Sequence, residues 1–351
     1  MQLFNRHKAN LNYIMFEVTQ RCNLNCVYCY NHWKRDGQEE KRSSTSFTEA
    51  LKTLKRLFKQ ANVKHVTFTG GEPMLMERIE ELVLFCRMKG ASVSMITNGT
   101  AASESQLLQL IKIGVEPFEL PFHSNDKAIH DRMTGVAGSW EKSKRSIQFI
   151  AQSGGFVVPV IVVTKHNFGT VGNTLEELNT MGFTRIMLNR YNIGGKGIGK
   201  PEEVLPTIEQ LNEAFGQANE TAMKLNLTIS SNVCTPHCVI NPQLYRSIGF
   251  TNCSMDVSKR PLTLAASGEL RFCNHSPTVL GNIFTEPVRT ILENGAKIGT
   301  IASRPTLCIG CNKYELCLGG CRAAAEQAGK TFFDVDPIAE KAFQYNEIKI
   351  N

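Results

Sequence analysis

Short β-rich runs alternate with amphipathic helical stretches from residue 13 to about residue 225. One helix opens at the capping box of Ser46 and Glu49, and a second carries apolar residues at helical spacing between Ile79 and Cys86. Six strand–helix units with short connections predict a parallel sheet, and six are too few to close an eight-stranded barrel. We therefore expect an α/β fold, an open partial (β/α)6 barrel of TIM-like type. Its predicted strands are Tyr13–Val18, Val63–Thr69, Ser92–Thr97, Glu116–Phe122, Phe156–Val163 and Phe183–Leu188.

The rhythm changes after Asn226, where Gly, Pro, Cys and short strand signals replace long periodicity as far as Thr285. A chain of 351 residues has room for about two domains. We predict a partial barrel over residues 1–228 and a small Cys-rich α+β iron–sulfur domain over residues 229–351. The second part has little regular apolar pattern, so we expect bound metal to supply its rigidity.

Composition narrows the class of protein. At 42% hydrophobic and 20% charged residues, the chain has a globular composition that excludes disorder. No stretch is apolar enough for a membrane span, and no signal peptide is visible, so a cytoplasmic location is expected. The net charge is +7. If three four-iron clusters bind to eleven of the chain's twelve cysteines as thiolates, they add a charge of about −5. The remaining positive charge is small, so no nucleic-acid partner is needed to explain it.

Twelve cysteines are the unusual part of the composition. Clustered cysteines in a long cytosolic chain indicate metal rather than disulfides. Cys22, Cys26 and Cys29 form a C-x3-C-x2-C group directly after the first predicted strand. Three thiolates on one loop hold three irons of a 4Fe–4S cube and leave the fourth iron open. A zinc site is disfavoured because no fourth cysteine lies nearby.

The loop resembles that of the radical S-adenosylmethionine (SAM) enzymes, and other segments match that family in order. Gly70–Pro73 is similar to the family's GGEP segment, which contacts the methionine amino group of SAM. Segments beginning at Thr97, His123 and Asn189 end later strands, where parallel β/α folds build their sites. The resemblance leaves open whether Ser124 or Asn125 contacts the ribose, and it assigns no catalytic side chain. It implies cofactor binding by Tyr28, Gly70, Gly71, Glu72, Pro73, Asn98, Ser124, Asn125 and Arg190.

The later cysteines resemble the SPASM extension of radical SAM maturases, which usually holds two auxiliary 4Fe–4S clusters. That pattern ends with one further cysteine, and this chain has none after Cys321. Cys234 and Cys238 precede the motif and bring the number of thiolates to the eight that two clusters require. The expected ligand sets are Cys253, Cys273, Cys321 and Cys238 for one cluster, and Cys308, Cys311, Cys317 and Cys234 for the other.

Three alternatives for these cysteines stay open. Asp334 or Asp336 could supply a missing ligand, or one iron could remain open for substrate. A zinc ribbon of the last four cysteines is the third alternative. Cys86, on the apolar stripe of a helix, is expected to be a small core residue.

If the resemblance holds, SAM chelates the open iron, and a 5′-deoxyadenosyl radical removes hydrogen from a substrate. SPASM proteins most often modify peptides, so we expect a ribosomally synthesised peptide substrate and a crosslink or another oxidative modification. The implied partners are a flavodoxin- or ferredoxin-type reductant and, because only 21 residues precede Cys22, a separate leader-binding protein or direct reading of the peptide. The alternatives are a dehydrogenase of a small carbinol, a sulfatase-type maturase, and a non-catalytic iron–sulfur carrier or sensor.

Overall fold

A curved eleven-stranded sheet organises the computed structural model, which describes residues 8–34, 45–301 and 304–350. Its order is β10-β9-β8-β7-β6-β5-β4-β2-β11-β12-β13, and neighbouring strands run parallel from β10 to β11. The six expected strands are confirmed. They are β2 (Ile14–Thr19), β4 (His65–Gly70), β5 (Ser92–Ile96), β6 (Val115–Pro121), β7 (Val157–Val163) and β8 (Arg185–Arg190).

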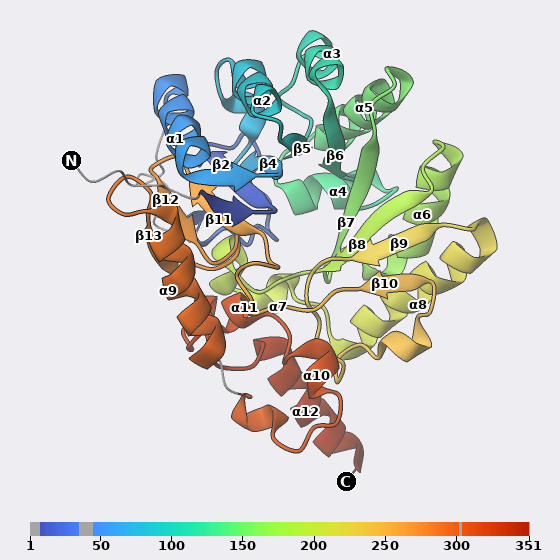
Figure 1. Ribbon diagram of the computed structural model, residues 1–351. Helices are drawn as coiled ribbons and strands as arrows, with labels where there is room; N and C mark the ends of the chain where they lie inside the picture. Colours follow the sequence, from blue (N-terminus) through green and yellow to red (C-terminus); the bar gives the residue numbers. More distant parts are fainter. Residues whose placement is uncertain (1–7, 35–44, 302–303, 351) are drawn as a thin grey trace.

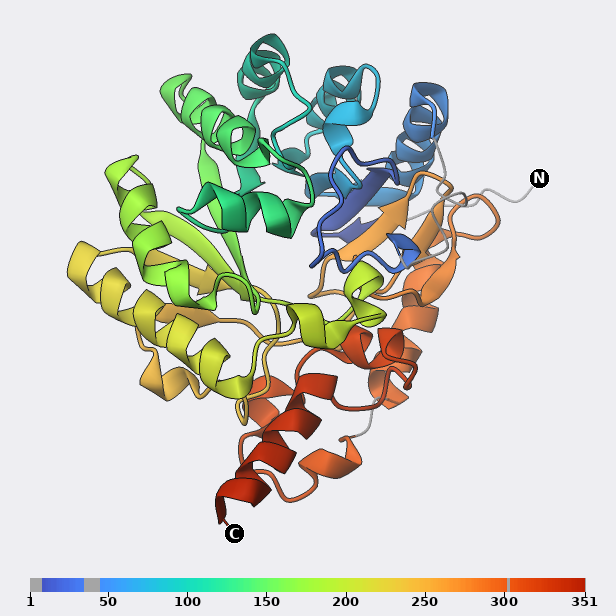
Figure 2. The ribbon, with the colours of Figure 1, turned by 180° about the vertical axis from the view of Figure 1, so that it is seen from behind.

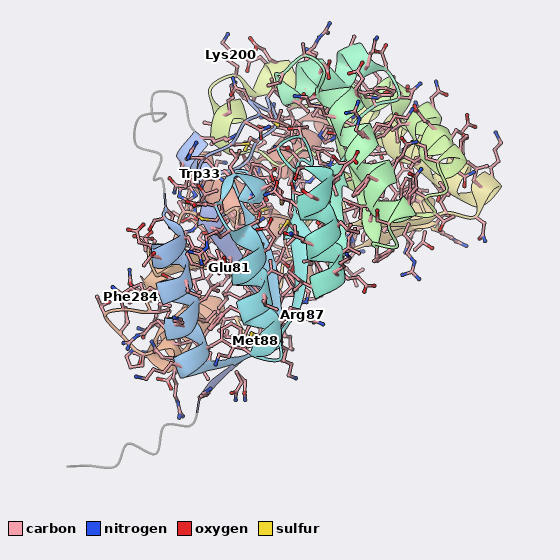
Figure 3. All side chains as sticks on the ribbon, turned by 90° about the horizontal axis from the view of Figure 1, so that it is seen from above. Trp33, Glu81, Arg87, Met88, Lys200 and Phe284 are labelled. Carbon is pink, nitrogen blue, oxygen red and sulfur yellow. The ribbon has the colours of Figure 1, made fainter. Side chains whose placement is uncertain are left out.

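Helices cover the convex face of the sheet (Figure 1), and the view from behind shows the same arrangement (Figure 2). The covering face of each strand is apolar; in β4, for example, Val66 and Phe68 are fully buried. Seen from above, α1, α2 and α3 lie side by side (Figure 3). The helices are α1 (Phe47–Gln60), α2 (Ile79–Met88), α3 (Glu104–Ile113), α4 (Lys127–Thr134), α5 (Ser139–Gln152), α6 (Val171–Thr180) and α8 (Ile208–Leu225).

The structure confirms the helix start predicted from the capping box. The capping box of Ser46 and Glu49 is formed, with both reciprocal hydrogen bonds present. The helix that carries the apolar residues from Ile79 to Cys86 begins at Ile79, because Arg78 adopts a left-handed conformation at φ 58° and Pro73–Leu75 forms a separate 3₁₀ turn, η3. Helix α4, which begins after the N-cap Asp126, was not predicted because its apolar pattern is short.

The second half of the chain extends the sheet at both edges. The strands β9 (Thr228–Ser231) and β10 (Ile248–Phe250) continue it beyond β8, whereas β11 (Leu262–Ala265) pairs in parallel with β2. β12 (Glu269–Arg271) and β13 (Val279–Asn282) complete the antiparallel edge. The predicted boundary at 228/229 therefore falls inside β9, and strands from both sides of it share one sheet.

The remaining helices lie at the lower end of the molecule in Figure 1. They are α7 (Pro201–Val204), α9 (Val288–Ile301), α10 (Tyr314–Cys317), α11 (Arg322–Gln327) and α12 (Pro337–Ile350). A separate two-stranded parallel sheet pairs β1 (Ala9–Leu11) with β3 (Ala61–Val63). Among the described residues, no helix combines the length and the apolar character that crossing a membrane requires.

Candidate cofactor and metal sites

The loop with Cys22, Cys26 and Cys29 follows β2 at the carboxyl edge of the sheet. Backbone hydrogen bonds from Asn25 N to Thr134 O (3.0 Å) and from Val27 N to Met133 O (2.9 Å) attach it to the end of α4. Burial, followed by the charge of Cys29, raises the pKa of Cys26 to about 12. A thiol in this environment ionises readily only beside a cation, so the three cysteines fit an iron cluster that binds them as thiolates.

The spacing of ligating side chains separates a cluster from a single ion. Among the described residues, no three His, Cys, Asp or Glu side chains are grouped so as to hold one metal ion. Each iron of a cube takes its own thiolate, so the cysteines of a cluster stand farther apart than four ligands around one zinc ion. Three thiolates on one loop match the number that a 4Fe–4S cube with one open iron requires.

Gly70 and Gly71 hold the end of β4 against the start of the cysteine loop. Gly71 N donates to Thr19 O (2.7 Å), and Glu72 N donates to Arg21 O (2.8 Å). A Cβ atom on Gly71 would lie 2.0 Å from Arg21 O, and one on Gly70, at φ +134°, would lie 2.3 Å from Thr19 O. The two glycines are thus required for an approach to the protein's own backbone, in addition to any ligand.

The carboxylate of Glu72 is fully buried and has internal partners. It accepts hydrogen bonds from Thr97 Oγ1 (2.5 Å), Asn98 N (2.7 Å) and Met74 N (3.0 Å). Burial raises its pKa, and these hydrogen bonds oppose that shift. The carboxylate therefore joins η3, which Pro73 begins, to the end of β5. Asn98 is itself engaged, because its Nδ2 donates to Asn23 Oδ1 (2.9 Å).

The two candidates for the ribose contact differ in their freedom. Ser124 is fully buried, its Oγ lies 3.0 Å from Thr170 Oγ1, and it accepts a hydrogen bond from Asp126 N (3.1 Å). The side-chain oxygen of Asn125, in contrast, is buried without a hydrogen-bond partner among the described residues. A buried acceptor without a donor is costly, so Asn125 is the better candidate for a ligand contact.

Tyr28 and His123 form a relay that ends at the cysteine loop. Val162 N donates to His123 Nδ1 (3.2 Å), so Nε2 carries the ring proton and lies 2.5 Å from the Tyr28 hydroxyl. The hydroxyl in turn forms a hydrogen bond with the Cys26 sulfur. This hydrogen bond lowers the pKa of Cys26, although burial raises it by more. Burial also holds the pKa of His123 well below its usual value, so its ring is neutral. The relay fixes the orientation of Cys26.

Lys34 is a residue of this site that the sequence analysis did not identify. Its side chain is buried, and its Nζ donates to Leu24 O (3.3 Å) inside the cysteine loop. Its positive charge lowers the pKa of Cys22 and Cys26, although burial has the larger, opposite effect. A lone lysine after a cysteine motif carries no periodic or spacing signal, so only the fold reveals this neighbour.

The Radical SAM superfamily model matches residues 16–178 of the chain. This part of the chain is therefore similar to radical SAM domains. Domains of this superfamily use SAM and a 4Fe–4S cluster, and the cysteine loop, the glycine pair and the Tyr28 relay lie within this part of the chain.

Relatives match far beyond the radical SAM domain. The PqqA peptide cyclase of Xanthomonas oryzae pv. oryzae is 25% identical over 344 residues, covering 96% of this chain and 89% of the relative. That of Granulibacter bethesdensis is 26% identical over 321 residues, covering 89% and 82%. Among solved structures, anSMEcpe with bound AdoMet and Kp18Cys peptide has a TM-score of 0.71 at 18% identity, covering 97% of this chain and 98% of that one.

A second structural neighbour is Streptococcus suis SuiB bound to the precursor peptide SuiA. Its TM-score is 0.70 at 15% identity, and the match covers 95% of this chain and 76% of that one. At these identities the structural likeness shows the fold, a partial-barrel radical SAM architecture that continues into the Cys-rich C-terminal region.

Arg190, expected to contact SAM, is engaged by other groups of the protein. Its guanidinium is buried, forms an ion pair with Asp336 and donates to Cys234 O (2.7 Å) and Thr235 Oγ1 (3.1 Å). The Asp336 carboxylate also accepts from Cys321 N (2.9 Å). Arg190 therefore joins β8 to the C-terminal cysteines, and Asp336, an alternative metal ligand in the sequence analysis, is already engaged.

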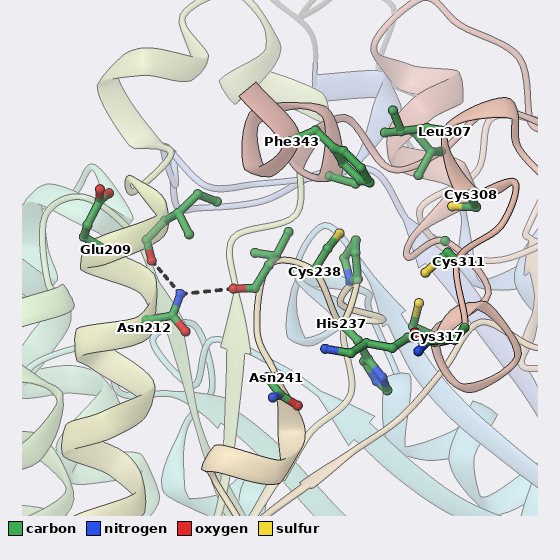
Figure 4. A pocket seen from close by; sticks show the side chains of 18 residues that line it. Glu209, Asn212, His237, Cys238, Asn241, Leu307, Cys308, Cys311, Cys317 and Phe343 are labelled. Atoms are coloured by element: carbon green, nitrogen blue, oxygen red, sulfur yellow. Dashed lines mark hydrogen bonds between the residues drawn. The ribbon is translucent and has the colours of Figure 1, made fainter. Parts of the chain in front are cut away.

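The C-terminal cysteines divide into two groups of four. The inner set lies beside the Arg190–Asp336 pair. The Cys234 thiol forms a hydrogen bond with Cys253 and lowers the pKa of Cys253, and the charges of Cys253 and Cys273 help to raise the pKa of Cys321. The outer set lines a cavity of about 640 Å³ between α8 and the C-terminal helices (Figure 4). The inner set is Cys234, Cys253, Cys273 and Cys321; the outer set is Cys238, Cys308, Cys311 and Cys317.

The grouping exchanges Cys234 and Cys238 relative to the expected pairing. Burial and then the charges of Cys317, Cys308 and Cys311 raise the pKa of Cys238 to about 12, so Cys238 belongs to the outer set. The spacing of the cysteines along the chain could not reveal this exchange, because Cys234 and Cys238, only four positions apart after β9, lie beside different sets of cysteines. Asp334 is engaged elsewhere, where it accepts hydrogen bonds from Thr331.

Proposed function

We propose that this protein is a radical SAM enzyme that oxidatively modifies a ribosomally synthesised peptide, with a crosslink as the leading product. The observation that carries the proposal is the cysteine loop, whose first residues are held against the glycine pair at the carboxyl edge of a partial barrel. Relatives named PqqA peptide cyclase match nearly the whole chain, and SuiB was solved with its precursor peptide, which supports a peptide substrate.

In this proposal Cys22, Cys26 and Cys29 hold the cluster. When bound, the cluster and SAM supply a 5′-deoxyadenosyl radical that removes a hydrogen atom from the substrate. The protein's own residues bind and orient: Tyr28 fixes the Cys26 sulfur, and Lys34 stabilises the thiolates. Main-chain atoms of residues 70–73 and the unpartnered oxygen of Asn125 face SAM.

We also propose two auxiliary 4Fe–4S clusters, one on the inner set and one on the outer set. Two observations support this assignment. All twelve cysteines are free thiols, and eight of them fall into two groups of four, which is the number of thiolates that one cube requires. Four thiolates in each set leave no auxiliary iron open for substrate, so both clusters would serve electron transfer.

The proposal extends to partners and location. A cluster that must be reduced before each SAM cleavage needs a small redox protein of the flavodoxin or ferredoxin type. A leader-binding protein remains a candidate partner for presenting the peptide. Twelve free thiols favour the reducing cytoplasm over an oxidising compartment.

The direct test uses anaerobically reconstituted protein with SAM and dithionite. We expect release of 5′-deoxyadenosine, and none from the Cys26→Ala variant. A short peptide encoded beside the gene, incubated in the same way, should lose 2 Da for each oxidative bond formed. Iron-loaded protein that binds SAM and never cleaves it would exclude the enzyme and leave the carrier or sensor. Cleavage with oxidation of a small alcohol, and of no peptide, would favour the dehydrogenase.

A further inference from the structure

A groove lined by lysines lies at the end of the barrel opposite the cysteine loop, beside the carboxyl ends of α1 and α2. Figure 3 labels Arg87 and Met88 at this end of α2. The groove has a volume of about 600 Å³ and includes the short β3 strand in its wall. The lysine groove, as we call it, is defined by Lys8, Lys55, Lys59, Lys64 and Lys89.

No acidic side chain of the described residues balances the charge of the lysine groove. Among the described residues, its lining contains no Asp or Glu, and none of its five lysines forms an ion pair. Helix dipoles account for Lys59 and Lys89, which lie at the ends of α1 and α2. They do not account for Lys8 or Lys64, which lie outside both helices. Five like charges repel one another, so the groove favours an anionic occupant.

The floor of the groove is apolar. Phe58, Ala61 and Val63 are almost fully buried there, so the partly exposed Phe85 provides the accessible apolar surface, with Lys89 Nζ 5.6 Å from the centre of its ring. An occupant that matches both features has negative charges along its length and apolar groups between them. An acidic peptide segment with interspersed apolar side chains has this character.

The same lining disfavours a nucleic acid. Single strands bind to aromatic faces on which their bases stack. Here Phe58 is only 7% exposed, and its ring packs edge-on against Phe85 with centroids 5.8 Å apart. Among the described residues that line the groove there is also no arginine, the side chain that binds phosphate in bidentate fashion. A peptide is therefore the better match.

We propose that the lysine groove binds an acidic segment of the peptide substrate, remote from the residues that react. This inference rests on the proposed function, and it makes the enzyme itself a reader of its substrate. Lys64 precedes β4 and Gly70 ends it, so six residues of strand separate the groove from the SAM edge. That length corresponds to about 20 Å, so at least about six extended residues must lie between the acidic segment and the modified site.

The test measures binding of a fluorescein-labelled peptide of Glu-Glu-Leu repeats to the full-length holoprotein by fluorescence anisotropy. The groove variant is Lys55→Glu/Lys59→Glu/Lys64→Glu. The control, Lys112→Glu/Lys142→Glu/Lys297→Glu, changes the net charge equally at exposed positions elsewhere. We expect the groove variant to lose at least about tenfold in affinity and the control about twofold or less. Wild-type binding should also weaken as salt rises.

Two further measurements keep the test decisive. Replacing the same three lysines with glutamine should also weaken binding, which excludes misfolding caused by the new carboxylates. Release of 5′-deoxyadenosine without peptide should be the same in the groove variant as in wild type. If wild type itself releases none, the proposed function fails, and this outcome is distinct from a failure of peptide binding at the groove. Equal losses in the groove and control variants would overturn the proposal. So would tighter binding of a dT12 oligonucleotide or of anionic phosphatidylserine vesicles at the groove than of the peptide.

Discussion

Several polar side chains of the site act on the protein itself rather than on a ligand. Glu72, which lies in the segment expected to contact the amino group of SAM, accepts hydrogen bonds from Thr97, Asn98 and Met74. Arg190, expected to contact SAM, forms an ion pair with Asp336 and donates a hydrogen bond to the backbone oxygen of Cys234. Residue type and position at a strand end thus predict that a side chain is near the site. Its partner depends on which donors and acceptors the fold brings within reach.

Glu119 of β6 provides a test at the scale of one residue. Burial raises its pKa from 4.5 to about 7, so the folded protein holds this proton more tightly than the unfolded chain. Its contribution to stability is complete below about pH 4.5 and is lost as the pH rises through about 7. We expect wild type to lose up to about 3 kcal/mol relative to Glu119→Gln between pH 4.5 and pH 8. Anaerobic urea unfolding of both proteins measures this difference, and parallel pH profiles would contradict it.

At the scale of elements, the contact between β4 and the cysteine loop positions the site. Two backbone hydrogen bonds and two glycines hold the end of β4 on the residues that precede Cys22. The parallel pairing of β2 with β4 brings these loops to the same edge, as expected for parallel sheets. The cofactor site is therefore built from adjacent strand ends rather than from one contiguous motif.

A methyl group tests this contact. Gly71→Ala would place Cβ 2.0 Å from Arg21 O, so we expect a loss of about 2–4 kcal/mol in the free energy of unfolding, together with weaker cluster loading. The matched control is Gly216→Ala in the helical interior of α8, where an added Cβ meets nothing within 4 Å. Helix propensity predicts that this change stabilises the protein by about 0.5–1 kcal/mol. Equal effects of the two substitutions in urea unfolding would rule out the steric explanation.

At the scale of the whole molecule, two buried ion pairs join the barrel to the C-terminal region. Arg271 on β12 donates to Glu17 on β2 (2.7 Å), and Arg190 on β8 pairs with Asp336 before α12. Together with β11 on one edge and β9 and β10 on the other, these pairs make the sheet one continuous support for all three groups of cysteines. The two predicted domains thus share a common core.

Breaking the second pair should be costly. Asp336→Asn leaves the buried guanidinium of Arg190 without its counter-charge, so we expect a loss of about 3–5 kcal/mol in the free energy of unfolding. The exposed pair Lys200–Glu203 is the control, and Glu203→Gln should cost less than about 1 kcal/mol. Anaerobic thermal unfolding compares the two variants. A small effect of Asp336→Asn would mean that water reaches Arg190.

The pairing of the cysteines can be measured by iron content. If Cys238 belongs to the outer set, Cys238→Ala added to Cys308→Ala removes no more iron than Cys308→Ala alone. Cys234→Ala added to Cys308→Ala should instead affect both auxiliary clusters, about eight irons in all. Cys86→Ala, on the buried face of α2, is the control and should retain all the iron. The reverse pattern in Mössbauer spectra and iron analysis would restore the pairing expected from the sequence.

What the sequence determined by itself is local. Strand–helix alternation specified six parallel strands, and the spacing of Cys22, Cys26 and Cys29 with Gly70–Pro73 indicated the candidate cluster site, because both signals depend on neighbours within a few residues. Only the tertiary structure decided which set Cys234 and Cys238 join, what Arg190 contacts and where five lysines converge. These features depend on how distant segments cross, and short strands such as β10 and β11 carry no periodicity that would reveal their partners.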